Sequence, residues 1–134
     1  MKPRRLTALA LAAAATAAVG CSSQEASDVA AVADRFHAAL ADGDAATACS
    51  ELAPETRSKL EQEEKARCDE AILKVKLPKD AQAGDASVYV TSASVALRGG
   101  RRTFLDQFAD GWKVSADGCT KTGSDEPYDC ELEG

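Results

Sequence analysis

Two side chains in this sequence have types suited to acid–base chemistry. His37 is the only histidine, and an imidazole titrates near neutrality, so it is a candidate general base at the edge of a pocket. The interpretation we favour is a partly exposed structural histidine beside Phe36. Asp106 is the second candidate, because desolvation on an apolar inward face favours the protonated form of a carboxylate. If Leu105 faces inward instead, Asp106 is solvated and has no special chemistry.

The register of a predicted β-hairpin decides between these two interpretations of Asp106. Gly99-Gly100 is a strong signal for a two-residue turn. With that turn at the centre, Val95 lies opposite Phe104 and Ala93 lies opposite Asp106. A shift of one residue would turn every side chain of the strand to the other face of the sheet.

The first twenty residues have the pattern of an export signal. Lys2, Arg4 and Arg5 give a positive start, and residues 6–19 are a stretch of Leu, Ala, Val and Thr. This stretch is too short to span a hydrocarbon core of about 30 Å, which takes about 20 residues. We therefore expect residues 1–20 to be a signal peptide.

The end of that segment, Ala18-Val19-Gly20-Cys21, resembles a bacterial lipobox. The resemblance implies that Cys21 becomes the first mature residue and is diacylated on sulfur by palmitate-type chains. It would hold the protein at the extracytoplasmic face of the cell membrane, since two chains give stable anchoring. The alternative is a conventional secretory signal that leaves Cys21 as a free thiol. We expect residues 21–26 to be a lipidated tether and residues 27–134 to form a single domain.

The four remaining cysteines are an even number, as expected for disulfides in an exported chain. They allow three pairings, of which we favour nearest neighbours: Cys49 with Cys68, and Cys119 with Cys130. Each bond would contribute roughly 2–4 kcal/mol to stability. A redox role has little support, because no cysteine has the close partner of a redox motif. With one histidine and no Cys-x-x-Cys, we expect no metal and no other cofactor.

Composition limits the partners and indicates a thin hydrophobic core. Three of the 16 Lys and Arg fall in residues 1–20, so residues 21–134 carry 13 against 22 Asp and Glu, a net charge of −9. That charge and the scarcity of aromatic residues argue against nucleic-acid binding. Leu, Ile, Val and Phe make up 19 of these 114 residues, a share close to that of disordered chains. The disulfides should therefore support the fold.

Helical and strand periodicities occur in separate halves of the chain. Apolar residues recur at helical spacing from Val29 to Leu40, and the clearest strands alternate apolar and polar residues. A change of parity near Thr91-Ser92 suggests a β-bulge. Helices packed on one face of an antiparallel sheet make an α+β fold. The predicted elements are helices at about 28–42, 45–52, 54–65 and 68–75, and strands near 88–97, 103–109, 112–114 and 128–132.

Three features together resemble uncharacterised lipoproteins of high-GC Gram-positive bacteria. They are the lipobox, an opening helix followed by Asp42-Gly43-Asp44, and a C-terminal pattern from Gly111-Trp112-Lys113-Val114 to Pro127-Tyr128-Asp129-Cys130-Glu131. The domain looks like the superfamily named after nuclear transport factor 2. That resemblance implies helices packed on a strongly curved antiparallel sheet that encloses a cone-shaped pocket. The residues expected at the pocket are Phe36, Leu40, Phe104, Phe108 and Trp112.

A fold of this kind says little about activity, because the superfamily holds both enzymes and non-enzymes. We expect a non-enzymatic, membrane-anchored extracytoplasmic module that binds an envelope protein or a small ligand. One alternative is an enzyme of the cyclase or isomerase type that uses Asp106 or His37. The other is a purely structural envelope protein.

Two clusters of charged residues are candidate ion sites, but for both we favour a solvated surface without a binding role. Arg98, Arg101 and Arg102 flank the predicted hairpin tip, where they are a candidate anion site or a charged, soluble end. Acidic residues near the C-terminus are a candidate weak calcium site, although they lack the spacing of an EF-hand, or a solvated face. The acidic residues are Asp117, Asp125, Glu126, Asp129, Glu131 and Glu133.

Overall fold

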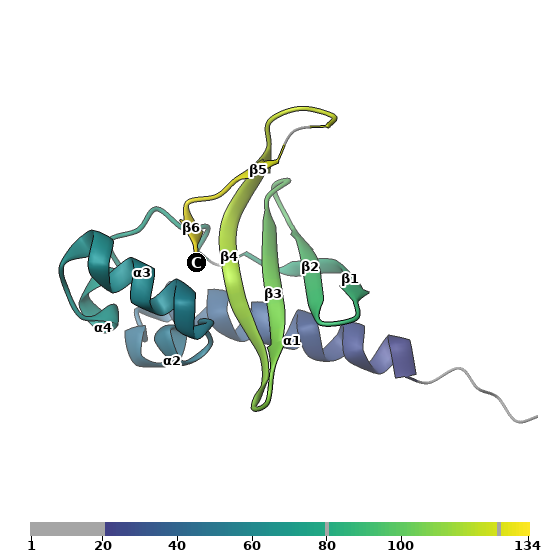
Figure 1. Cartoon of the computed structure of the whole chain (residues 1–134), viewed down its shortest axis with the longest axis horizontal. Helices are drawn as coiled ribbons and strands as arrows, with labels where there is room; N and C mark the ends of the chain where they lie inside the picture. The colour runs from purple at the N-terminus through teal and green to yellow at the C-terminus, as the bar shows by residue number, and fades with distance from the viewer. Residues whose placement is uncertain (1–20, 80, 126) are drawn as a thin grey trace, which may run out of the picture.

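The computed structural model describes residues 21–79, 81–125 and 127–134 (Figure 1). The predicted signal peptide, residues 1–20, lies outside the described residues. Within them, four helices precede six strands, which confirms the α+β order. The helices are α1 (Cys21–Asp42), α2 (Ala45–Ser50), α3 (Pro54–Glu64) and α4 (Cys68–Ala71). The strands are β1 (Ala83–Tyr89), β2 (Ser92–Leu97), β3 (Arg102–Phe108), β4 (Gly111–Lys121), β5 (Tyr128–Asp129) and β6 (Leu132–Glu133).

The first helix extends further toward the N-terminus than its apolar pattern indicates. α1 begins at Cys21 rather than near residue 28, so the segment expected to be a tether, residues 21–26, is helical. A helix rises about 1.5 Å per residue, less than half the reach of an extended chain. Cys21 therefore lies nearer to the domain than an extended tether of the same length would place it. Val29 and Phe36 are fully buried, as the periodicity predicts.

Local signals explain where the shorter helices begin. Asp44 caps α2, because its side chain accepts a hydrogen bond of 3.1 Å from the backbone N–H of Thr47. Pro54 occupies the first turn of α3, where its missing N–H costs nothing. α4 ends at Ala71, earlier than predicted, although the apolar stripe continues into the fully buried Ile72.

The strands form one antiparallel meander that packs against α1. The order is β1-β2-β3-β4, and both β5 and β6 pair with β4. The sheet is not strongly curled (Figure 1), so the cone expected from the superfamily resemblance is not formed. The physical reason is strand length: β5 and β6 have two residues each, and only β4, with 11, is long enough to bend far around a core.

The hairpin between β2 and β3 has a different register from the one predicted. Leu97 N–H donates to Arg101 O at 2.8 Å, so the loop holds three residues, 98–100, instead of two. Val95 consequently lies opposite Thr103, and Ala93 lies opposite Leu105. A slip of one residue exchanges the two faces of a strand. Leu105 is fully buried on the inward face, and the predicted register is wrong.

The parity change near Thr91-Ser92 marks a tight turn rather than a bulge within a strand. Tyr89 pairs with Ser92, which leaves Val90 and Thr91 as the two turn residues. Val90 has φ of +52°, in the left-handed region. Hairpin turns usually place Gly or Asn in that region, because a β-branched side chain is strained there.

A bulge in β4 brings Asp117 to the inward face. Trp112 and Val114 face inward at even positions, whereas Asp117 and Cys119 face inward at odd positions. The pairing with β3 shifts between these two sets. Gly118 has φ of +67°, and a side chain there would meet that of Glu131 at 3.0 Å, so glycine suits both the conformation and the space.

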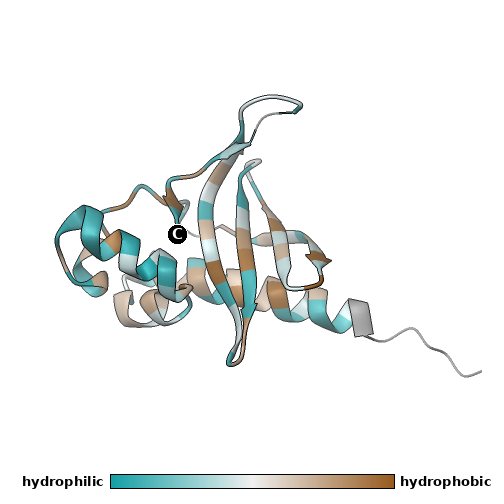
Figure 2. Cartoon of the chain, viewed as in Figure 1, coloured by the Kyte–Doolittle hydropathy of each residue, from teal (hydrophilic) through white to brown (hydrophobic). Residues whose placement is uncertain are grey.

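The core lies between α1 and the sheet, and hydrophobic and hydrophilic residues alternate along β3 and β4 (Figure 2). Trp112 belongs to the same buried cluster as Phe36. Beyond these two rings the cluster is built largely from Ala, Val and Leu. Its small side chains explain why the fold needs covalent support.

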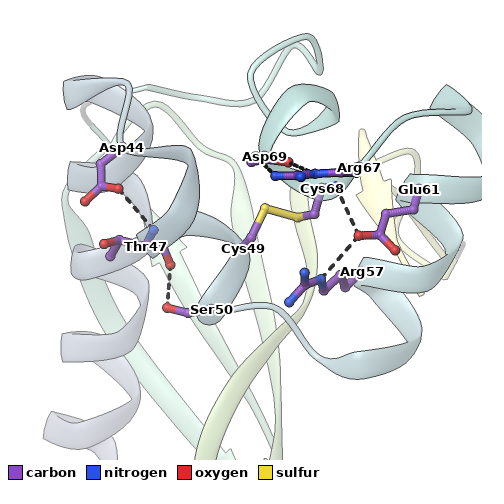
Figure 3. The surroundings of a disulfide bond; sticks show 9 residues. All are labelled: Asp44, Thr47, Cys49, Ser50, Arg57, Glu61, Arg67, Cys68 and Asp69. Carbon is purple, nitrogen blue, oxygen red and sulfur yellow. Dashed lines mark hydrogen bonds and ion pairs between the residues drawn. A yellow bond between two sulfur atoms is a disulfide. The ribbon is translucent and has the colours of Figure 1, made fainter.

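Both favoured disulfides are formed. Cys49 and Cys68 join α2 to α4, and both are almost fully buried. Cys119 and Cys130 join β4 to the segment between β5 and β6. Figure 3 shows Cys49–Cys68 beside Glu61, whose Oε1 accepts a hydrogen bond of 3.0 Å from the Cys68 N–H. The two disulfides point to an extracytoplasmic location, because such bonds persist in oxidising compartments.

Val90→Asn should raise the free energy of unfolding by about 1 kcal/mol, because asparagine adopts the left-handed conformation at much lower cost than valine. Urea denaturation of the two proteins measures the difference. Val90→Ala is the matched control, and its gain should be smaller, because alanine also disfavours this conformation. Equal stability of the unchanged protein and Val90→Asn would contradict the strained turn.

Candidate functional site

A buried cluster of three polar side chains joins α1 to the sheet. Nε2 of His37 lies 3.2 Å from Oδ1 of Asp117 and 3.2 Å from Oγ1 of Thr103. The hydroxyl of Thr103 donates to Oδ1 of Asp117 at 2.6 Å. All three residues are fully buried: His37 lies on α1, Thr103 on β3 and Asp117 on β4. His37 is thus not the partly exposed residue that we expected.

Hydrogen-bond geometry indicates the protonation state of His37. Its Nδ1 lies 2.8 Å from the carbonyl oxygen of Pro78, which accepts only, so Nδ1 carries a proton. The Thr103 hydrogen is already donated to Asp117, so Nε2 also has only acceptors beside it. The ring is therefore placed to donate from both nitrogens, as an imidazolium paired with a carboxylate.

The pKa of His37 follows from two opposed effects. Burial is the largest single effect and lowers the pKa, because it disfavours the charged ring. The hydrogen bond and the negative charge of Asp117 act in the other direction, joined by the hydrogen bond to Pro78. Together they outweigh burial, so the pKa of His37 is raised above its ordinary value of 6.5.

This cluster is closed to substrates as the chain is folded. His37, Thr103 and Asp117 have no exposed surface, and no described cleft is lined by any of them. A general base must reach the proton that it removes. The arrangement therefore supports a structural ion pair. Oδ2 of Asp117 is buried and has no hydrogen-bond partner among the described residues. The buried carboxylate is therefore stabilised only by the contacts of Oδ1 with His37 and Thr103.

Sequence reasoning missed Asp117 as a partner of His37. Strict alternation along β4 would place it on the outer face, and we expected it to be a solvated acidic residue. The signal that could have revealed it is the Asp117-Gly118 dipeptide inside a strand, since an isolated glycine there indicates a bulge.

Asp106 has no role in this cluster. The corrected register places it beside Lys113 on the outward side of β3, where it is only half-buried. It faces away from the layer that contains His37, so the two candidate acid–base residues are not brought together. The interpretation that Leu105 faces inward holds.

The five residues expected at a pocket are divided between the two faces of the sheet. Phe36, Leu40 and Trp112 are buried in the core. Phe104 and Phe108 are half-buried on the other face, where Phe104 packs edge-to-face on Tyr128 with ring centroids 5.0 Å apart. The predicted shared pocket is therefore not formed by these residues.

An open, charged cleft lies between α1 and the β3–β4 turn. Its volume is about 390 Å³, and its walls include Ala31, Arg35 and Asp110. Arg35 makes a two-pronged hydrogen bond to Glu51, at 3.0 and 3.3 Å, which holds α1 to the end of α2. The remaining lining residues are Asp28, Val32, Gly111, Trp112 and Lys113.

Lys113 and Asp110 fix the opposite wall of that cleft. Nζ of Lys113 donates to the carbonyl oxygen of Ser50 at 2.9 Å and lies 3.5 Å from Oδ2 of Asp110. The hydrogen bond of Arg35 to Glu51 raises the pKa of the guanidinium, which stays charged. The cleft thus presents fixed charges of both signs beside the edge of Trp112.

The other predicted charge clusters do not form a site. Arg102 donates to Ser94 at 2.9 Å, whereas Arg98 lies in the exposed β2–β3 loop and Arg101 follows it. Glu126 lies outside the described residues. Within residues 21–79, 81–125 and 127–134, no group of three His, Cys, Asp or Glu side chains is placed to hold a metal ion.

Comparison with known proteins gives no relative: no family model, curated protein or solved structure matches this chain. In the part of the chain that the structure describes, no helix has the length and hydropathy needed to cross a bilayer. The arguments about function therefore depend on the residues themselves.

The free energy of unfolding should fall as the pH rises above about 6.5. The unfolded chain releases the His37 proton near 6.5, whereas the folded chain holds it to higher pH. The stabilisation is complete below pH 6.5 and is lost as the pH rises through the raised pKa, at about 1.4 kcal/mol per pH unit. Denaturation at a series of pH values measures the slope, and NMR of the imidazole follows the proton.

Asp117→Asn is the matched variant for that measurement. Burial then acts on His37 without the carboxylate and lowers its pKa, so the loss of stability above pH 6.5 should disappear, and the free energy of unfolding should instead fall as the pH drops below 6.5. A flat profile across neutral pH in the unchanged protein, with an imidazole that titrates below 6.5, would contradict the ion pair.

Proposed function

We propose that this protein is an extracytoplasmic lipoprotein, anchored in the cell membrane through Cys21, whose domain binds a protein partner of the cell envelope. The observation that carries the binding role is the cleft between α1 and the β3–β4 turn. The lipobox supports the anchor, and the two disulfides support the compartment. The element order is in keeping with a small member of the superfamily named after nuclear transport factor 2, with a sheet too short to enclose a cone.

The chemistry of the cleft favours a protein over a small ligand. Small-molecule sites are enclosed, mostly apolar and bury most of the ligand. This cleft is open and lined by charged side chains from α1 and the β3–β4 turn, such as Arg35 and Asp110, around one buried aromatic edge. The cleft carries positive and negative side chains that are fixed by ion pairs with neighbouring residues. Such charges contribute more to the choice of a partner than to the affinity for it.

An enzymatic role has weaker support. Acid–base catalysis needs at least two polar groups that converge on one cavity. His37 is sealed inside the fold, and Asp106 lies on the outer side of the sheet. Neither residue lines the cleft.

The anchor is tested by Cys21→Ser in a high-GC Gram-positive host. We expect the unchanged protein in the membrane fraction and the variant released, because the acyl chains attach only to the cysteine sulfur. Mass spectrometry of the mature N-terminal peptide should show the diacylglyceryl group on the unchanged protein. Ser22→Ala is the control and should stay in the membrane. A Cys21→Ser protein that still fractionates with membranes would contradict the anchor.

The cleft is tested by photo-crosslinking from Ala31, which lies exposed on its α1 wall. We expect one specific envelope protein to be captured in cells, and capture should fall several-fold in Asp110→Lys, which reverses an exposed charge on the opposite wall. Ala38 is the matched control, because it is an exposed alanine of the same helix that lines a different groove. Equal capture from both positions would contradict a binding role for the cleft.

A further inference from the structure

The turn between β1 and β2 displays two hydrophobic side chains to solvent. Tyr89 is 64% exposed and Val90 is 89% exposed. Among the described residues the only other large hydrophobic side chain in this class is Leu73, at 38%. Single exposed hydrophobic residues are common on surfaces, but two adjacent ones at a protruding turn are a candidate contact site.

This turn is also the one sheet turn of the meander without charge. The twelve residues 86–97 include no Asp, Glu, Lys or Arg, in a chain of which 28% is charged. The β2–β3 turn, in contrast, carries Arg98 and is followed by Arg101, and the β3–β4 turn carries Asp110. A charge-free tip can enter an apolar environment without desolvating an ion.

The backbone holds the two side chains in place. Val90 keeps its left-handed φ of +52°, and the N–H of Gln107 on β3 donates to the carbonyl oxygen of Thr91 at 2.8 Å. The turn therefore displays Tyr89 and Val90 on a fixed support. A strained β-branched residue at a fully exposed position contributes nothing to the core, so its benefit must lie in what it contacts.

The position of the turn indicates what it contacts. β1 packs along α1 and runs toward the end of the molecule at which α1 begins (Figure 1). The first residue of α1 is Cys21, and the helix is continuous from there. A lipid on Cys21 would therefore bring the bilayer to the end of the domain that carries the β1–β2 turn, whereas the β2–β3 turn lies at the opposite edge of the sheet (Figure 1).

We propose that Tyr89 and Val90 insert into the interface of the bilayer to which Cys21 is anchored, and that this second contact fixes the orientation of the domain on the membrane. The inference rests on the proposed lipid anchor. Tyrosine suits the headgroup level, because its ring is apolar and its hydroxyl is polar. Valine suits the acyl boundary.

The charges near the β1–β2 turn determine whether its attraction to the bilayer is electrostatic or apolar. Residues 21–134 are acidic overall, and Glu25 and Asp28 lie in the first part of α1. Anionic headgroups would repel these groups, so the attraction is apolar, and added salt, which screens the repulsion, should not weaken it.

The experiment uses the full lipidated protein in phosphatidylglycerol vesicles whose acyl chains are brominated, because bromine quenches tryptophan that enters the bilayer. Tyr89→Trp adds a probe at the tip, and Leu73→Trp is the matched control at the other exposed hydrophobic position. The unchanged protein, which has only the buried Trp112, gives the baseline. We expect the Tyr89→Trp probe to be quenched several-fold more than the Leu73→Trp probe, with emission shifted to shorter wavelength.

A third probe and a flotation assay separate the outcomes. Arg101→Trp reports on the basic β2–β3 turn, and stronger quenching there than at Tyr89→Trp would overturn the proposal. Equal quenching of the Tyr89→Trp and Leu73→Trp probes would also overturn it. Vesicle flotation tests the anchor separately: protein that floats without quenching at the tip contradicts only this inference. If the unchanged protein recovered from the host carries no lipid on Cys21 and does not float, that result contradicts the proposed anchor itself.

Discussion

The ion pair between His37 and Asp117 is the contact on which the two layers of this fold depend. It joins the first helix to the longest strand, and Thr103 adds the neighbouring strand to the same cluster. The carbonyl group of Pro78 extends it to the connection between the helices and the sheet. A buried charge is tolerated only when its partners are in place. The helix, the sheet and their connection must therefore be correctly placed together.

The disulfides stabilise the regions that the ion pair does not reach. Cys49–Cys68 ties two short helices, neither of which would be stable alone. Cys119–Cys130 ties the two-residue strands to β4, two positions beyond Asp117. β4 is thus the element where the ion pair, one disulfide and both final strands meet. This concentration compensates for a core with few large apolar side chains.

The sequence predicts the elements well where periodicity and turn residues agree. The apolar stripe from Val29 to Leu40 and both disulfide pairings appear in the structure. The errors arise where one residue changes the register. A three-residue loop at Gly99-Gly100 turns Asp106 outward, and the register shift between Val114 and Ala116 turns Asp117 inward.

The candidate site could not be predicted for a related reason. The partner of His37 is 80 positions away, between residues that local patterns place on the surface. Only the combination of loop length and bulge brings it to the inner face. The cleft at Arg35 depends on side-chain contacts between three segments, which no local pattern encodes. The superfamily resemblance implied a strongly curved sheet, but the two-residue lengths of β5 and β6 limit how far this sheet curls.

The edges of the sheet have a consequence for how other proteins can be recognised. The outer side of β4 is occupied along much of its length, by β5, by β6 and by residues 51–53, whose backbone pairs with Val114. β1 forms the other edge, and its ladder is broken by an irregularity next to the charged Asp85. Neither edge offers a regular row of amide and carbonyl groups to an incoming strand. A protein that bound this molecule would therefore have to contact its side chains rather than add a strand to its sheet, and the same covered edges disfavour fibrous self-association.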